Sequence, residues 1–113
     1  MIRNATKKTT IADEYRRCSS PLSKSRGLMF SPKPKTLLFT WPKEKKIPLH
    51  MLFVFFPIDV LFLDKERKVV ELKEDFLPFR FYFPAKKAQY IIEAPRTTIA
   101  GSKTSIGDII TFI

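Results

Sequence analysis

The sequence HMLFVFFPIDVLFL, residues 50–63, is almost continuously apolar and rich in Phe, Val and Ile. Such a run is typical of a central strand buried on both faces of a sheet. Pro57 has no N–H to donate to a neighbouring strand, so we expect a bulge or a break there. The run is interrupted by Pro57 and Asp59 and is shorter than the ~20 residues of a membrane-spanning helix. We therefore predict a buried strand and no membrane span.

Short apolar segments on both sides of this run predict further strands. Nine prolines divide the chain into pieces too short for long helices. Residues 64–67 lie between two apolar runs and read as a hairpin turn. Besides the central run, strands are expected at Thr36–Trp41, Lys68–Lys73, Gln89–Ala94 and Ile109–Ile113.

One short helix is predicted near residues 20–27. Ser20 is a favourable N-cap, Pro21 suits the first helical position, and Gly27 would end the helix. The fold class expected is mainly β, a compact antiparallel β-sandwich or barrel. Because 113 residues is the usual size of one domain, we expect a single β-rich domain over 1–113, with residues 1–10 either flexible or an edge strand.

Positive charge is concentrated in the first half of the chain. Residues 1–50 hold 12 Lys and Arg against 3 Asp and Glu, whereas residues 51–113 hold 9 against 8. A positive field attracts polyanions, so a nucleic-acid partner bound through residues 1–50 is one interpretation. The other, which we favour, is a lysine-rich solvated surface of the kind found in hyperthermophile proteins.

The cysteine content and the N-terminus predict a cytoplasmic protein. Cys18 is the only cysteine, so no disulfide can form within the chain, and nothing indicates an oxidising compartment. Residues 1–10 carry three cations but are not followed by an apolar segment of signal-peptide length.

Asp59 and His50 are the first two candidate ligand-binding residues. An ideal strand from Met51 to Leu63 would place Asp59 on the same face as Phe53 and Phe55, and a buried carboxylate must be paired, hydrogen-bonded or protonated. We favour a structural Asp59 held by backbone N–H groups or by Arg26 over a polar anchor in a small-ligand pocket.

His50 is the only histidine, whereas metal sites usually need three or four ligands. We therefore expect no metal, no cofactor and no catalytic constellation.

The stretch Phe79-Arg80-Phe81-Tyr82, followed by two lysines, interleaves rings with cations. Single-stranded nucleic-acid platforms have this composition, which makes Phe79 and Arg80 candidate binding residues beside His50, Asp59 and Arg26. The interpretation we favour is that these rings plug the end of a sandwich. Contact with a membrane surface ranks last, because the segment is broken by proline rather than helical.

Several short motifs occur together in the order and spacing of one family. They are Gly27-Leu28-Met29-Phe30, His50-Met51, Pro57-Ile58-Asp59, Phe62-Leu63-Asp64, Tyr90 to Glu93 with Pro95, and Gly107-Asp108. From about Ala12 to its C-terminus the chain resembles domain of unknown function 192, also called uncharacterised protein family 0127, in its archaeal form. The resemblance implies a β-sandwich or barrel whose members stand alone and have no established activity.

Two positions depart from the pattern of that family. Arg67 stands where relatives often place a turn glycine, so a positive φ there would strain the chain by about 1 kcal/mol. Thr97 replaces a second frequent glycine, which leaves the shape of the 95–106 connection open.

The function expected is that of a small non-enzymatic binding or interaction module for an unidentified small ligand or partner. A nucleic-acid-associated basic protein is the alternative. An enzyme acting through Asp59 and His50 is third, and it requires those side chains to approach within roughly 3 Å of one another or of one ligand atom. The oligomeric state is left open.

Overall fold

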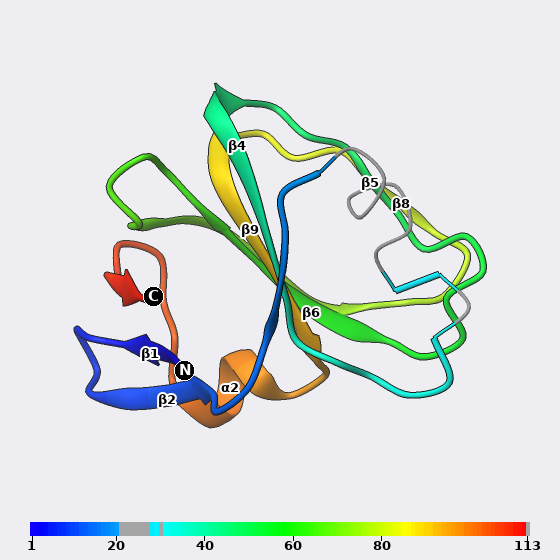
Figure 1. The fold of residues 1–113 in the computed structure, drawn as a ribbon, viewed down its shortest axis with the longest axis horizontal. Helices are drawn as coiled ribbons and strands as arrows, with labels where there is room; N and C mark the ends of the chain where they lie inside the picture. Colours follow the sequence, from blue (N-terminus) through cyan, green and yellow to red (C-terminus); the bar gives the residue numbers. More distant parts are fainter. Residues whose placement is uncertain (21–27, 30, 113) are drawn as a thin grey trace.

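A five-stranded sheet forms the centre of the computed structural model, which describes residues 1–20, 28–29 and 31–112. Its strand order is β3-β4-β9-β6-β7, and its neighbours are antiparallel except for β3 and β4 (Figure 1). The strands are β3 (Arg16–Cys18), β4 (Leu37–Lys45), β9 (Ala88–Pro95), β6 (Ile58–Leu63) and β7 (Val69–Phe76).

Two smaller sheets cover the two faces of this sheet. One has the order β10-β1-β2, and the other pairs β5 with β8. Their strands are β1 (Ile2–Asn4), β2 (Thr9–Ala12), β10 (Ile110–Thr111), β5 (Leu49–His50) and β8 (Phe81–Tyr82), and the short helix α2 spans Thr98–Ser102. The fold is therefore mainly β and sandwich-like, not a closed barrel.

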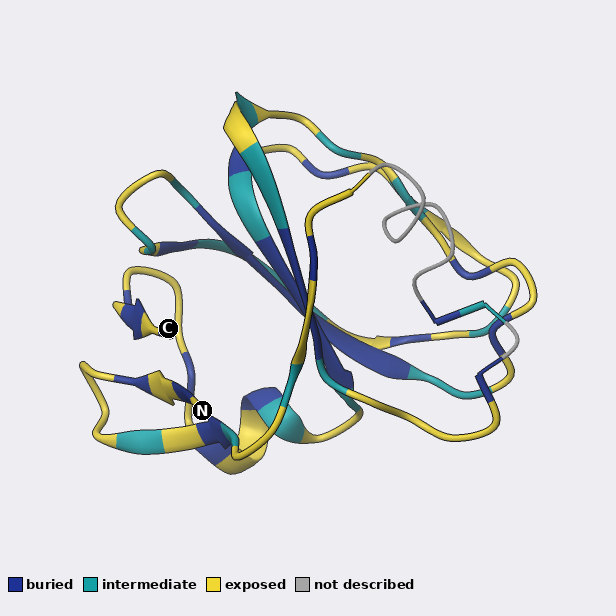
Figure 2. Cartoon of the chain, in the orientation of Figure 1, coloured by how far each residue is buried: buried dark blue, intermediate teal, exposed yellow. Residues whose placement is uncertain are grey.

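Strand β6, an interior strand of the sheet, separates two apolar clusters. Ile58, Val60 and Phe62 pack in the cluster beneath β5 and β8, whereas Leu61 and Leu63 pack with the small sheet and α2. All six residues of β6 are buried, and Figure 2 shows the strand dark blue along its length. Burial of one large apolar side chain contributes roughly 1.5–3 kcal/mol, so the apolar residues of this strand together contribute substantially to stability. The predicted strand buried on both faces is confirmed for residues 58–63.

The first half of the apolar run does not belong to that strand. β5 ends at His50, and β6 begins only after Pro57. Between them the chain turns, with Phe53 at a φ of 59° and its side chain exposed. The expectation that Asp59 shares a strand face with Phe53 and Phe55 is wrong, because the extended chain is interrupted at the predicted break before Ile58.

The other predicted strands agree with the structure. β4, β7 and β9 lie over the segments expected at 36–41, 68–73 and 89–94, and residues 64–67 connect β6 to β7 as a hairpin turn. Of the strand expected at 109–113, β10 forms only Ile110–Thr111. The helix predicted near residues 20–27 falls almost wholly outside the described residues. The helix that is described, α2, occupies the 95–106 connection and follows Thr97, which has a φ of 71°.

Arg67 adopts the positive φ, 63°, that its family position suggested. Its guanidinium donates a hydrogen bond to the Phe112 carbonyl over 2.8 Å and lies 3.9 Å from the centre of the Phe112 ring. These contacts offset the backbone strain of about 1 kcal/mol that a glycine would avoid.

The first strand, β1, lies in the interior of the small sheet. β1 lies between β10 and β2, with Arg3 paired to Thr111 on one side and to Thr10 on the other. Of residues 1–10, Ile2–Asn4 thus form an interior strand because β10 comes from the far end of the chain, whereas Thr9 and Thr10 begin β2 at the edge of the sheet. Within the described ranges, helices are too short for a membrane crossing.

Candidate functional site

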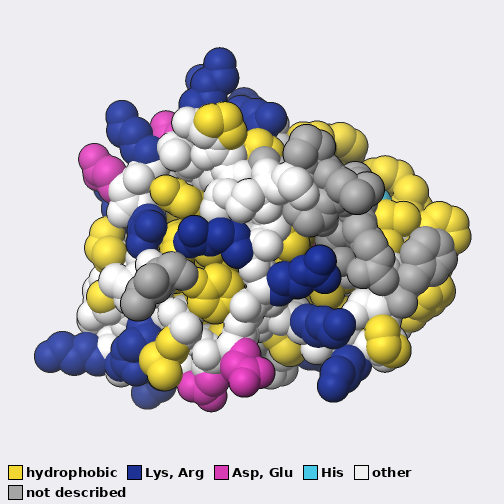
Figure 3. All heavy atoms as spheres, in the orientation of Figure 1, with side chains coloured by type: hydrophobic (Ala, Val, Ile, Leu, Met, Phe, Trp, Pro, Cys, Tyr) yellow, Lys and Arg dark blue, Asp and Glu magenta, His cyan; other side chains and the backbone are white. Residues whose placement is uncertain are grey.

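Exposed apolar side chains gather at one end of the molecule. Ten large apolar side chains of the described residues are exposed, and seven of them come from the two short segments 52–55 and 77–83. We call these seven the aromatic tip: Leu52, Phe53, Phe55, Leu77, Phe79, Phe81 and Phe83, with exposed fractions from 36% to 76%. Figure 3 shows hydrophobic side chains crowded at the end of the molecule that carries β5 and β8 in Figure 1.

Backbone hydrogen bonds hold the two segments of the aromatic tip together. β5 and β8 pair antiparallel, with His50 opposite Phe81. Beyond the strands, the Met51 N–H donates to the Arg80 carbonyl and the Phe79 N–H donates to the Met51 carbonyl, each over 2.8 Å. The two turns that carry the rings are therefore positioned by a ladder and not by the rings alone.

Phe79 is the hub of the ring cluster. Its ring centre lies 5.7 Å from that of Phe55 and 6.3 Å from that of Phe53, and both pairs meet edge to face. Phe53 and Phe79 each have a φ of 59°, a left-handed conformation that strains a bulky residue by roughly 1–2 kcal/mol. Strain of this kind is concentrated at sites of function.

The base of the aromatic tip is fastened to the central sheet through Tyr82. Its ring packs on Phe62 and Phe76, and its hydroxyl donates to the Glu71 carboxylate. Glu71 also accepts the backbone N–H groups of Ala85 and Lys86, each over 3.0 Å. Burial raises the pKa of Tyr82 to about 12, and the hydrogen bond and charge of Glu71 add to the rise. Tyr82 therefore stays a hydrogen-bond donor at neutral pH.

Exposed cations lie within or next to the two segments of the aromatic tip in the sequence. Segments 46–57 and 77–87 contain no Asp or Glu, and their cations are Lys46, Arg80, Lys86 and Lys87, all exposed. His50 is also exposed, and its Nδ1 accepts the Leu52 N–H over 3.2 Å. We call Lys46, Arg80, Lys86 and Lys87 the rim cations of the tip. The Glu71 carboxylate, which accepts the Ala85 and Lys86 N–H groups, lies at the base of the same tip.

The structure brings together three of the five residues selected from the sequence. His50, Phe79 and Arg80 lie on neighbouring backbone of the aromatic tip, although the favoured interpretation of the segment was a buried plug. Arg26 lies outside the described residues. Asp59 is on the other face of the central sheet, so it does not approach His50.

Asp59 is held by backbone groups from two elements. It is 1% exposed, and its two carboxylate oxygens accept the N–H of Asp75 over 3.0 Å and the N–H of Ile99 over 2.9 Å. Ile99 lies in the first turn of α2, whose unpaired N–H groups favour a negative partner. This carboxylate therefore fastens β7 and α2 to β6.

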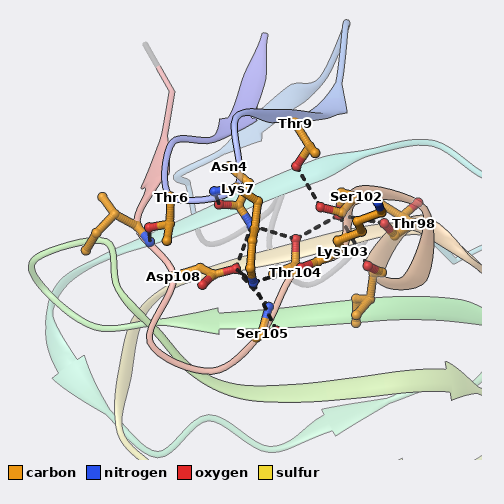
Figure 4. Close-up of polar contacts among 12 residues, drawn as sticks. Asn4, Thr6, Lys7, Thr9, Thr98, Ser102, Lys103, Thr104, Ser105 and Asp108 are labelled. Atoms are coloured by element: carbon orange, nitrogen blue, oxygen red, sulfur yellow. Dashed lines mark hydrogen bonds and ion pairs between the residues drawn. The ribbon is translucent and has the colours of Figure 1, made fainter.

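A second buried polar group, Asp108, joins the two ends of the chain (Figure 4). Its Oδ2 accepts hydrogen bonds from Asn4 over 2.8 Å, from the Lys7 ammonium over 2.9 Å and from the Ser105 N–H over 2.9 Å. Asn4 also donates to Thr104. With these partners in place, the network acts as a connection between β1 and the C-terminal segment.

We predict that Asp108→Asn lowers the free energy of unfolding at neutral pH. In acid, the free energy of unfolding of this variant should depend less on pH than that of the wild type. Burial alone would raise the pKa of Asp108, but hydrogen bonds from Asn4 and Lys7 outweigh it and lower the pKa below 3.8. The carboxylate therefore stabilises the fold above pH 3.8, and this contribution is lost as the pH falls further. Urea unfolding of both proteins between pH 7 and pH 2.5 measures the difference, with exposed Asp13→Asn as control. Parallel curves would contradict the prediction.

Glu93 is the group that sequence reasoning missed. It lies on β9 opposite Leu37 and Val60, in the face that β5 and β8 cover, and is 9% exposed. Burial raises its pKa to about 7, and no hydrogen bond from a described residue reaches its carboxylate. In residues 90–94 of the sequence, Tyr90, Ile92 and Ala94 point to one face of a strand and Ile91 and Glu93 to the other. This pattern does not indicate that other segments cover both faces. Burial raises the pKa of nearby Cys18, and the negative charge of Glu93 raises it further.

Residues 2–112 match the model of the DUF192 family, described as Uncharacterized ACR. The chain belongs to this family. A UPF0127 protein of Pyrococcus furiosus is 37% identical to the DUF192 chain over 107 residues, covering 93% of this chain and 91% of the relative. A UPF0127 protein of Pyrococcus horikoshii is 37% identical over 110 residues, covering 96% and 95%. The archaeal form of the resemblance is therefore confirmed.

Two crystal structures share the fold of the DUF192 chain. A protein of unknown function from Novosphingobium aromaticivorans has a TM-score of 0.80 at 16% identity, over 87% of this chain and 74% of that one. A putative transcription regulator from Sinorhizobium meliloti has a TM-score of 0.80 at 20% identity, over 86% and 79%. At these identities the likeness concerns the fold alone.

Proposed function

We propose that this DUF192 chain is a non-enzymatic binding module whose contact surface is the aromatic tip, with residues 1–113 acting as one domain in the cytoplasm. The observation that carries the proposal is the gathering of seven of the ten exposed large apolar side chains on two hydrogen-bonded turns. Large contiguous apolar patches are rare on monomers and mark surfaces that contact something else.

Backbone strain supports the same proposal. Phe53 and Phe79 hold their rings outward at a φ of 59°, where asparagine or glycine would be more stable by roughly 1 kcal/mol. Neither ring is buried enough to repay this strain through the core. A residue that weakens the fold and faces solvent is the pattern expected where function opposes stability.

The two alternatives, a nucleic-acid-associated basic protein and an enzyme, have weaker support. Lys and Arg side chains are spread over the face drawn in Figure 3 and do not form one stripe along it. An enzyme that uses Asp59 together with His50 would need both on one side of the central sheet, and they lie on opposite sides.

We predict that Phe79→Asn leaves the melting temperature within about 5 °C of the wild type and lowers several-fold the binding of an anionic dye whose aromatic rings bind apolar surface. Asparagine tolerates the left-handed conformation, so relief of strain compensates for the lost ring contacts. The measurements are thermal unfolding and the fluorescence of 8-anilinonaphthalene-1-sulfonate.

Ile106→Asn is the matched control, because Ile106 is also exposed but lies outside the aromatic tip. It should leave dye binding unchanged. A fall of the melting temperature by more than about 10 °C in Phe79→Asn would mean that the ring serves the core. Unchanged dye binding in that variant would also contradict the proposal.

A further inference from the structure

The charge around the aromatic tip restricts what it can contact. Its four rim cations, Lys46, Arg80, Lys86 and Lys87, are exposed, whereas the Glu71 carboxylate at its base is hydrogen-bonded to Tyr82 and to the Ala85 and Lys86 N–H groups. Two copies of the chain meeting tip to tip would bring these cations together, and like charges oppose such contact. The complementary surface is one that joins apolar groups to negative charge.

The arrangement of the rings distinguishes among anionic partners. Single-stranded nucleic acid needs ring faces free for bases to stack on. The Phe79 ring instead meets Phe53 and Phe55 edge to face, at interplanar angles of 72° and 64°. The three rings form one compact apolar knob with a shared outer surface. Such a knob suits a fluid apolar layer better than a row of separate bases.

We infer that the aromatic tip binds the surface of an anionic lipid bilayer, with its Phe and Leu side chains in the interfacial layer and its rim cations against the headgroups. The inference rests on the proposed function, since it names the partner of the same surface. Amphipathic helices that carry apolar and basic side chains enter the bilayer by ~5–10 Å without crossing it, and the same forces act on an apolar tip beside cations. The exposed rings lie on turns, so the contact needs no helix.

Rim cations should set the affinity for charged lipid. Each Lys or Arg near an anionic surface strengthens binding by about fivefold at low salt. Lys86→Gln combined with Lys87→Gln should therefore weaken binding by about 25-fold. Lys65→Gln combined with Lys68→Gln removes the same charge from the exposed β6–β7 turn, away from β5 and β8 (Figure 1), and should weaken it far less.

The experiment is co-sedimentation of the full chain with sucrose-loaded vesicles at 50 mM and 500 mM NaCl. The vesicles contain either phosphatidylcholine alone or equal parts of phosphatidylcholine and phosphatidylglycerol. We expect the wild type to pellet with the anionic vesicles at low salt and to lose most of this binding at high salt or on neutral vesicles. Phe79→Asn combined with Phe81→Asn should reduce binding at least tenfold, and Ile106→Asn should not.

Four outcomes would overturn the inference. Failure of the wild type to pellet, while dye binding still depends on Phe79, would remove the lipid partner and leave the proposed function standing. Equal losses in the two lysine pairs would show that only net charge matters. Tip-dependent binding to a 20-nucleotide oligothymidine without vesicle binding would assign the surface to nucleic acid. A dimer that Phe79→Asn dissociates would assign it to a second copy.

Discussion

Asp59→Ala is expected to lower the free energy of unfolding by about 3–5 kcal/mol. The substitution leaves the N–H groups of Asp75 and Ile99 without their acceptor, and each buried unsatisfied donor costs about 1–3 kcal/mol. It also leaves a cavity beside β6, which adds to the loss. Urea unfolding at pH 7 gives the difference directly.

Asp64→Ala is the matched control for this prediction. Asp64 also accepts two backbone N–H groups, those of Glu66 and Lys68, but it lies in the hairpin turn where water can replace the carboxylate. We expect a loss of about 1 kcal/mol for this variant. If Asp59→Ala were no more harmful than Asp64→Ala, the carboxylate of Asp59 would not be the anchor of α2.

Glu93→Gln is expected to stabilise the protein at pH 8 by an amount on the order of 3 kcal/mol and to change little at pH 4. The pKa of Glu93 rises from 4.5 to about 7 on folding. Below pH 4.5 both folded and unfolded chains carry the proton, so the group has no net effect. Between pH 4.5 and about 7 Glu93 is ionised in the unfolded chain but still protonated in the folded one. The free energy of unfolding therefore falls by about 1.4 kcal/mol for each pH unit in this range.

Urea unfolding of both proteins between pH 4 and pH 8 tests this sign. Glutamine keeps the size and polarity of the side chain, so the two curves should diverge only where Glu93 ionises. Glu66→Gln, in the exposed hairpin turn, should run parallel to the wild type. A Gln variant that is less stable than the wild type at pH 8 would contradict the prediction and indicate a cation paired with the ionised Glu93.

The two faces of the central sheet have separate tasks. The face toward α2 and the small sheet holds Asp59 and the Asp108 network, whose hydrogen bonds are made within the protein. The other face supports Tyr82 and, beyond it, the exposed rings. A rigid sheet that positions binding residues on its loops is a common arrangement, because loops vary without loss of the core.

Local patterns in the sequence were sufficient for much of the sheet. The apolar run placed β6, Pro57 marked its beginning, and the polar residues 64–67 placed the hairpin. Phe79 and Arg80 were selected as candidates because rings alternate with cations over a few residues. These features depend on contacts between close neighbours along the chain, so composition and spacing reveal them.

Contacts between distant segments decided the rest. A continuous apolar run carries no periodicity, so nothing local distinguished exposed Phe53 and Phe55 from buried Phe62. β5 pairs with β8, about thirty residues later, and β1 pairs with β10 at the far end of the chain. Glu93 becomes buried because segments remote in the sequence cover the face of β9 on which it lies. Residue types thus determined where strands form, whereas tertiary packing determined which of their side chains meet water.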